Sequence, residues 1–181
     1  MKFRNTVLAI GVSVLLGGCV SDSTYDKEVN TANTYQQLNT QLAGELAADQ
    51  AQIQQLQGLV RVTLANGILF PEGGWELDAR GKATLAKLAP VLKTLTGQTI
   101  RVKGYTDNVP IGPELRQRFP TNVDLSKARA QSVANELMAG GVPASMISVM
   151  GFGDADPVAP NDTAQGLAKN RRVVMDVVEA K

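Results

Sequence analysis

Histidine is absent from the sequence, and cysteine occurs only once, at Cys19. Histidine is the commonest general base and metal ligand in enzymes, and a single cysteine cannot form an intramolecular disulfide. Most hydrolytic mechanisms therefore lack their usual parts in this chain. We expect no catalytic residues, no metal site and no cofactor.

Aromatic residues and excess charge are also scarce, since aromatics make up 4% of the chain and the formal net charge is +1. Two of the 18 basic residues, Lys2 and Arg4, lie in a segment that we expect to be removed, which leaves 16 basic against 17 acidic residues. Nucleic-acid-binding proteins need a basic surface, and those that bind single strands also need aromatic stacking platforms. The composition therefore excludes nucleic acid as a partner.

The remaining composition is that of an ordinary folded chain. Apolar residues amount to 44% and charged residues to 19% of the 181 residues, close to the average for soluble domains. Wholesale disorder and a polytopic membrane protein are both excluded. The length fits one globular domain plus a tail.

The N-terminus has the pattern of a secretory signal. Lys2 and Arg4 precede an apolar stretch, Val7–Leu16, that is too short to span a bilayer. The following residues, Leu16-Gly17-Gly18-Cys19, resemble the bacterial lipobox. This resemblance implies that residues 1–18 are a cleaved signal peptide and that Cys19 carries acyl chains such as palmitate. The alternative is an ordinary signal peptide with a chance cysteine.

Acyl chains on Cys19 would anchor the protein stably, because more than one chain is needed for lasting membrane attachment. Val20 follows Cys19, where enteric inner-membrane lipoproteins carry aspartate. We therefore expect a lipid-anchored protein of the outer membrane that faces the periplasm.

Two segments separate Cys19 from the first predicted strand. Residues 19–33 are polar and show no apolar periodicity, which predicts a flexible spacer. Residues 34–58 carry apolar side chains at steps of three, four or seven, which predicts a helical tether about 35 Å long with a hinge at Gly58. This helix could form a coiled coil with another copy or an envelope protein, or it could be a single helix packed on its own domain.

Residues 59–181 predict an α+β domain, with helices packed on one face of a mixed sheet. Alternating residues predict strands at 59–64, 68–70, 99–102, 146–150 and 172–178. Asp78 is the predicted N-cap of a helix with a kink or a break at Pro90, and Ser126 is the predicted N-cap of a second helix. The long segment 104–122 between them is typical of a functional loop.

Four sequence blocks in this region resemble the OmpA-like peptidoglycan-binding domain shared by Pal-type lipoproteins, OmpA C-terminal domains and MotB. The resemblance covers about residues 60–179 and implies a βαβαββ-type domain that binds peptidoglycan. The blocks are Gly104-Tyr105-Thr106-Asp107, Asn122 with Leu125-Ser126 and Arg129-Ala130, Gly151-Phe152-Gly153 with Pro157 and Asn161, and Asn170-Arg171-Arg172-Val173.

The sequence departs from the family pattern in two places. Tyr105 stands where the family usually has histidine, so a phenol replaces any imidazole hydrogen bond there. The loop 108–121 is longer than in Pal and looks more like the MotB branch. Both departures lie beside the expected site.

The resemblance implies a site for diaminopimelate, whose side chain ends in an ammonium and a carboxylate on one carbon. In the family, the aspartate matching Asp107 takes the ammonium, and the arginine matching Arg129 takes the carboxylate. We place Arg129 in the first helical turn after Ser126, where free backbone N–H groups also favour an anion. The remaining predicted site residues are Thr106, Asn122, Leu125 and, as a secondary candidate, Arg171.

The sequence therefore predicts a non-catalytic outer-membrane lipoprotein that binds peptidoglycan and tethers the membrane to the wall. An alternative is an envelope scaffold that recruits a protein partner through the 34–58 helix, with wall binding only localising it. A third possibility, a wall-degrading enzyme, would depend on Asp107 and Glu114 as a carboxylate pair. Nothing in the sequence fixes the separation of these two carboxylates, so we expect no enzyme.

Overall fold

The computed structural model describes residues 22–42, 50–56 and 58–180. The predicted signal peptide, residues 1–18, and the predicted lipidation site Cys19 lie outside the described residues. None of the described helices is both long and apolar enough to cross a membrane.

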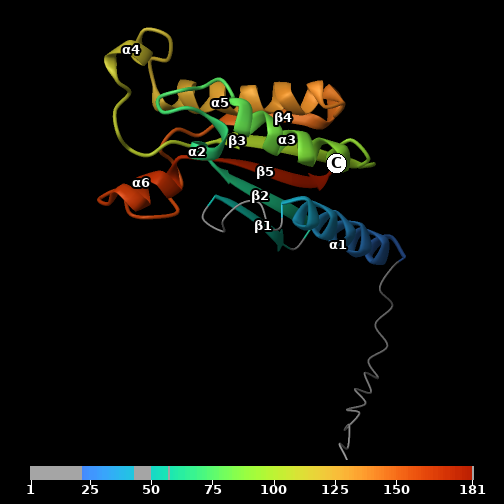
Figure 1. Ribbon diagram of the computed structural model, residues 1–181. Coiled ribbons are helices and arrows are strands. Elements are labelled where there is room, and N and C mark those ends of the chain that lie inside the picture. Colours follow the sequence, from blue (N-terminus) through green and yellow to red (C-terminus); the bar gives the residue numbers. More distant parts are fainter. Residues whose placement is uncertain (1–21, 43–49, 57, 181) are drawn as a thin grey trace, which may run out of the picture.

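A five-stranded mixed sheet forms the centre of the molecule, in the order β1-β2-β5-β3-β4 (Figure 1). All neighbouring strands are antiparallel except β3 and β4, which are parallel. This arrangement confirms the predicted α+β class. The strands are β1 (Ala51–Leu56), β2 (Leu59–Ala65), β3 (Gln98–Gly104), β4 (Ile147–Gly151) and β5 (Arg172–Glu179).

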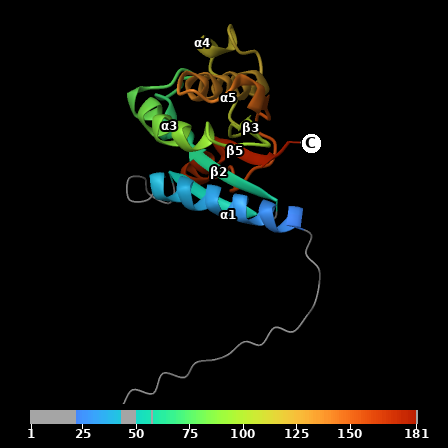
Figure 2. The ribbon, with the colours of Figure 1, turned by 90° about the vertical axis from the view of Figure 1, so that its right-hand side faces the viewer.

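Three longer helices lie on one face of this sheet, with α1 beside β1 and β2 and with α5 beside β3 and β4 (Figures 1 and 2). Side chains from all three helices and from the inward face of the sheet form one buried core. The longer helices are α1 (Asp22–Leu42), α3 (Ala79–Leu92) and α5 (Asn122–Ala139), and the short ones are α2 (Asn66–Leu69), α4 (Pro113–Arg116), the 3-10 helix η1 (Ala144–Met146) and α6 (Ala164–Asn170).

Alternation along β2 shows how the sequence sets the core. Val60, Val62 and Leu64 are at most 1% exposed, whereas the residues between them are partly exposed. Each such side chain contributes roughly 1.5–3 kcal/mol by leaving water. The central strand β5 is buried on both faces over most of its length. The core therefore fixes the C-terminal end of β3 and the N-terminal end of β5, where the candidate site lies.

The N-terminal part of the fold corrects the predictions of a flexible spacer, 19–33, and a helical tether, 34–58, where the structure describes them; residues 19–21, 43–49 and 57 lie outside the described residues. The predicted flexible spacer is helical from Asp22 onwards, and the end of the predicted tether, Ala51–Leu56, is the strand β1. In so short a segment, the apolar spacing around Ile53 fits both the helical period and the strand period. The segment forms a strand because it pairs with the free edge of β2. Gly58 is in the turn between these strands, with a φ of 75° that favours glycine.

Helix α1 packs on its own domain, as the simpler of the two predicted alternatives required. Leu38 is fully buried and belongs to the main core, and Tyr35 packs against that core. Leu38 could join a coiled-coil seam only by leaving this core. Helix α1 is therefore a layer of the domain and not a tether that projects from it.

The segments around α2 and α3 test three further secondary-structure predictions. The predicted strand 68–70 is wrong, because Ile68 and Leu69 belong to the short helix α2. The break that was one of the two alternatives at Pro90 does not occur, since α3 continues to Leu92 and contains Pro90 in its last turn. The cap of α3 is confirmed, because the Asp78 side chain accepts a hydrogen bond of 2.7 Å from the Gly81 backbone N–H.

Candidate functional site

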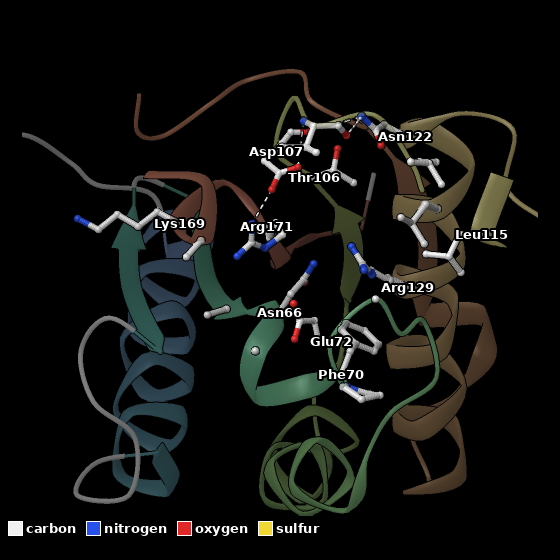
Figure 3. A pocket seen from close by; sticks show the side chains of 18 of the residues that line it. Asn66, Phe70, Glu72, Thr106, Asp107, Leu115, Asn122, Arg129, Lys169 and Arg171 are labelled. Carbon is white, nitrogen blue, oxygen red and sulfur yellow. Dashed lines mark hydrogen bonds and ion pairs between the residues drawn. The ribbon is translucent and has the colours of Figure 1, made fainter. Parts of the chain in front are cut away.

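A pocket of about 820 Å³ opens where β3 ends and β5 begins. Its walls come from α2 and the loop after it, from the loop that follows β3, from the first half of α5, and from α6 (Figure 3). All six predicted binding residues line it: Thr106, Asp107, Asn122, Leu125, Arg129 and Arg171. The structure thus brings together side chains that are far apart in the sequence.

Close packing of β3 on α5 positions the first wall. A Cβ atom on Gly104 would collide with the carbonyl oxygen of Ser126, so only glycine allows this approach. Beyond Gly104, the Tyr105 N–H donates to the Arg172 carbonyl at 2.9 Å, and the Thr106 N–H donates to the Gly153 carbonyl at 2.7 Å. The backbone that leads to Asp107 is therefore held from both sides.

Asp107 is a buried carboxylate that already has a cationic partner. It is 7% exposed, and its Oδ2 lies 2.6 Å from Nη1 of Arg171. Its Oδ1 accepts a bond of 3.2 Å from the Val109 N–H, and Asn122 donates from Nδ2 to the Val109 carbonyl at 3.2 Å. These contacts orient the carboxylate at the pocket wall. An incoming ammonium group would compete with Arg171 for Asp107.

Arg129 is a buried cation without a carboxylate partner among the described residues. Its Nε donates to the Gly74 carbonyl at 2.8 Å, its only side-chain hydrogen bond to a described residue. Burial lowers the pKa of Arg129 to about 10, against the opposing effect of the negative charge of Asp107. The side chain is therefore still charged at neutral pH, and it can bind an anion in the pocket.

The predicted position of Arg129 in the first helical turn is wrong. Helix α5 begins at Asn122, and Thr121 is its N-cap in a capping box with Asp124. Arg129 is thus two turns inside the helix, away from the terminal N–H groups. The prediction that Ser126 caps this helix is therefore also wrong. Its hydroxyl donates to the Val123 carbonyl and accepts from the Gly153 N–H, each at 2.9 Å.

The long loop 108–121 has a small core of its own. Ile111 and Phe119 pack with Leu125 of α5 in a second buried cluster, and the Trp75 ring meets the Phe119 ring edge-on at 5.2 Å. The Ser132 hydroxyl donates to the Trp75 carbonyl at 2.7 Å and thereby holds the loop that contains Trp75. This packing gives the pocket an apolar wall beside its charged groups.

Sequence reasoning missed Asn66, the first residue of α2, as a site residue. Asn66 is 6% exposed and lines the pocket, and neither its Nδ2 nor its Oδ1 has a hydrogen-bond partner. The hydroxyl of Thr106 is likewise buried and unpartnered. No local pattern could have shown this, because the lack of partners depends on segments that meet only in the folded chain.

Two neighbouring arginines, Arg171 and Arg172, lie at the start of β5 and point to different surroundings. Arg171 faces the pocket, whereas Arg172 lies over the Tyr105 ring with 3.8 Å between Cζ and the ring centroid. Arg172 donates to the carbonyls of Asn170 and Asp156, and not to an acidic side chain. Tyr105 also stacks on Phe152 and does not line the pocket. The departure at Tyr105 therefore lies outside the site.

The carboxylate pair considered for an enzyme does not form in the structure. Glu114 is exposed on α4 and does not line the pocket that contains Asp107. Among the described residues, no group of three or more acidic, histidine or cysteine side chains is placed to hold a metal ion.

Known proteins resemble this chain in sequence and in fold. The chain is 40% identical over 112 residues to the probable lipoprotein YiaD of Escherichia coli, which covers 62% of this chain and 48% of that protein. It is 34% identical over 138 residues to the outer-membrane lipoprotein YfiB of Pseudomonas aeruginosa, covering 73% and 78% of the two chains. The chain thus spans only about half the length of the first of these relatives.

A solved structure agrees with these relatives. The structure described as the cell wall anchor of the T6SS from Pseudomonas aeruginosa matches with a TM-score of 0.71 and 32% identity, over 79% of this chain and 97% of that one. The family model described as "OmpA family" matches residues 69–171, more than half of the chain and including all the pocket residues named above except Asn66. This protein belongs to the OmpA family.

Proposed function

We propose that this protein is an outer-membrane lipoprotein that binds peptidoglycan non-covalently and tethers the membrane to the cell wall, without catalysis. One observation carries the proposal: a buried acid, Asp107, and a buried base without a carboxylate partner, Arg129, line the same pocket. The wall-anchoring description of the related Pseudomonas structure supports it.

The ligand that fits these charges best is the zwitterionic end of diaminopimelate in a stem peptide. Arg129 can take the carboxylate through two parallel hydrogen bonds, because only its Nε is used within the described protein. Asp107 takes the ammonium in competition with Arg171. Leu125 and its apolar neighbours face the methylene chain of the ligand, and Thr106 and Asn122 complete the rim.

Lipid anchoring at Cys19 would place the domain close to the membrane. Two residues, Val20 and Ser21, separate Cys19 from Asp22, the first described residue of α1, and three extended residue-to-residue steps span at most about 10 Å. The first residues of α1 lie at the end of the domain away from α4 and α6, which border the pocket (Figure 1). In this arrangement the domain itself bridges membrane and wall, with the pocket directed away from the membrane.

Binding to a single stem peptide should be weak, and stable attachment should depend on the number of anchored copies bound to the same wall. The side chains that would pair with the ligand are buried, so the cost of removing both charges from water offsets much of the attraction between them. Many anchored copies on one polymer nevertheless hold firmly, because each bound copy keeps the others at a high effective concentration.

Co-sedimentation with purified wall sacculi tests this function. We expect the lipid-free chain, residues 20–181, to sediment with sacculi and to release no muropeptides. Asp107→Ala and Arg129→Ala should each weaken binding by about 2 kcal/mol, roughly thirtyfold, because each leaves a buried ligand charge unpaired. Matched controls are Asp154→Ala and Lys127→Ala, which remove exposed charges outside the pocket. Full binding by both pocket variants would refute the site, and released muropeptides would refute the absence of catalysis.

The described residues do not support the alternative in which the 34–58 segment is a scaffold helix that recruits a protein partner. Leu38 of α1 is buried in the domain core, and β1 is a strand of the sheet. Deleting residues 34–56 would therefore damage the fold as well as any partner site. Substitutions of exposed α1 residues such as Val29, which is 38% exposed, would test partner binding more cleanly.

A further inference from the structure

The described part of the chain contains three buried side-chain nitrogen or oxygen atoms without a hydrogen-bond partner, and all three belong to residues of the same pocket. They are Nδ2 and Oδ1 of Asn66 and Oγ1 of Thr106. Buried polar groups in folded proteins nearly always have partners, and leaving one without a partner costs free energy. Their clustering points to a ligand that supplies the missing bonds.

The position of Asn66 does not require its side chain. Its backbone N–H donates to the Arg171 carbonyl at 3.0 Å, and its own carbonyl accepts from the Phe70 N–H at 2.9 Å. These two bonds hold Asn66 beside Arg171 at the start of α2, and any side chain would leave them intact. The carboxamide forms no structural bond of its own. In Figure 3, it lies between the side chains of Arg171 and Arg129.

We propose that Asn66 is a ligand-binding residue that recognises the main chain of the stem peptide. This inference rests on the function proposed above. A carboxamide presents one donor and one acceptor on the same edge. In an extended peptide, the N–H and C=O of a single residue offer the complementary pair, as they do between neighbouring β-strands. Asn66 would therefore read the peptide backbone, while Asp107 and Arg129 hold the charged end of the side chain.

Arg171 controls access to Asn66. Each unpartnered amide atom exposes less than 1 Å², so the carboxamide is covered in the ligand-free protein. The Arg171 side chain next to it is 41% exposed and is bound to Asp107. When the ligand ammonium takes Asp107, Arg171 is released and can move away from Asn66. Binding of the charged end thus uncovers the group that binds the backbone.

Calorimetry with two probes tests this inference on the purified full chain in detergent. The probes are free meso-diaminopimelate, which has no peptide bond, and a soluble muropeptide whose stem ends in the same residue. Asn66→Leu keeps a similar side-chain size and removes both polar atoms. We expect it to weaken muropeptide binding about tenfold, because ligand groups lose their partners. Its affinity for free diaminopimelate should stay within about twofold of wild type, because charged-end binding does not use Asn66.

Thermal unfolding distinguishes recognition from a structural role. Asn66→Leu should leave the Tm unchanged or higher, because leucine buries no unpartnered polar group. Asn66→Ala provides a second, smaller substitution, and Asn135→Ala, on the exposed side of α5, is the control. Unchanged muropeptide binding by both Asn66 variants would overturn the inference, as would a lower Tm with equal loss of both ligands. If wild type binds neither probe, the proposed function fails and takes this inference with it.

Discussion

Two buried aspartates, Asp107 and Asp176, lie on different sides of the domain and differ in how fully they are paired. Asp176 is 2% exposed and receives two bonds from Arg61, at 2.6 and 2.9 Å, and one from Lys103 at 2.7 Å. Asp107 receives one bond from an arginine side chain, that of Arg171. Both carboxylates have a guanidinium nitrogen at 2.6 Å, so the nearest contact alone does not distinguish them.

The surroundings of the two carboxylates do distinguish them. Both partners of Asp176, Arg61 and Lys103, belong to strands that neighbour β5 in the sheet. They donate to both oxygens of the Asp176 carboxylate. Around Asp107, the pocket contains the unpartnered atoms of Asn66 and Thr106 and the unpaired charge of Arg129. We call the cluster around Asp176 saturated, because its groups have partners within the protein, and such a cluster stabilises the fold. The cluster around Asp107 is unsaturated, because some of its polar groups have no partner among the described residues, and it can therefore bind a ligand. Mutations at the two sites should therefore separate stability from binding.

The largest expected effect tests whether backbone packing, more than charge, positions the pocket end of the sheet. Gly104→Ala would force β3 away from α5, because its Cβ collides with the Ser126 carbonyl oxygen. Overpacking against rigid backbone should lower the free energy of unfolding by about 3 kcal/mol. Urea denaturation measures this loss. The control is Gly67→Ala, whose Cβ meets nothing within 4 Å, so a similar loss there would contradict the packing explanation.

The next largest effect tests the comparison directly. Asp176→Asn removes the negative charge between two cations and turns an NH2 donor toward one of them. We expect a loss of about 2–3 kcal/mol in unfolding free energy after allowing for the partial exposure of Arg61. Asp107→Asn should cost about 1 kcal/mol or less, because Arg171 reaches solvent. Binding to sacculi should show the reverse order. Equal stability losses would break the distinction between saturated and unsaturated clusters.

Acid unfolding provides a third, smaller test of the Asp176 cluster. Burial opposes ionisation of Asp176, but hydrogen bonds from Arg61 and Lys103, together with their charges, outweigh it and lower the pKa of the folded state. The stabilisation is thus complete above the ordinary pKa of about 4 and is lost as the pH falls through the lower folded pKa. The difference in urea midpoint between wild type and Asp176→Asn should stay constant from about pH 7 to 5. Below about pH 4 it should narrow, and a difference that narrows already near neutral pH would contradict this assignment.

Sequence reasoning succeeded where local pattern or motif order carries the information. The alternation around Val62 predicted β2, and the Asp78 cap predicted the start of α3. The blocks around Asp107 and Arg129 predicted which side chains would meet in one pocket.

Most failures occurred where tertiary contacts decide the outcome, although the start of α5 was missed despite its local capping box of Thr121 and Asp124. The β1 segment has an ambiguous period, and only pairing with β2 makes it a strand. The Arg171–Asp107 pair and the unpartnered amide of Asn66 depend on where β5, α2 and the loop after β3 meet. No single-sequence pattern shows whether a buried side chain will find a partner. The most informative residue of the site, Asn66, was therefore missed.

The smallest expected effect concerns Tyr105, where the family usually has histidine. Tyr105 stacks on Phe152 with ring centroids 5.0 Å apart and supports Arg172, but it does not line the pocket. Tyr105→His should lower the free energy of unfolding by about 1 kcal/mol through lost ring contacts. Affinity for muropeptide should stay within about twofold of wild type, because no pocket group changes. A large change in affinity, measured by calorimetry, would mean that the far side of the sheet and the pocket are coupled through residues 105–107, and the two aspartates could then no longer be treated as independent.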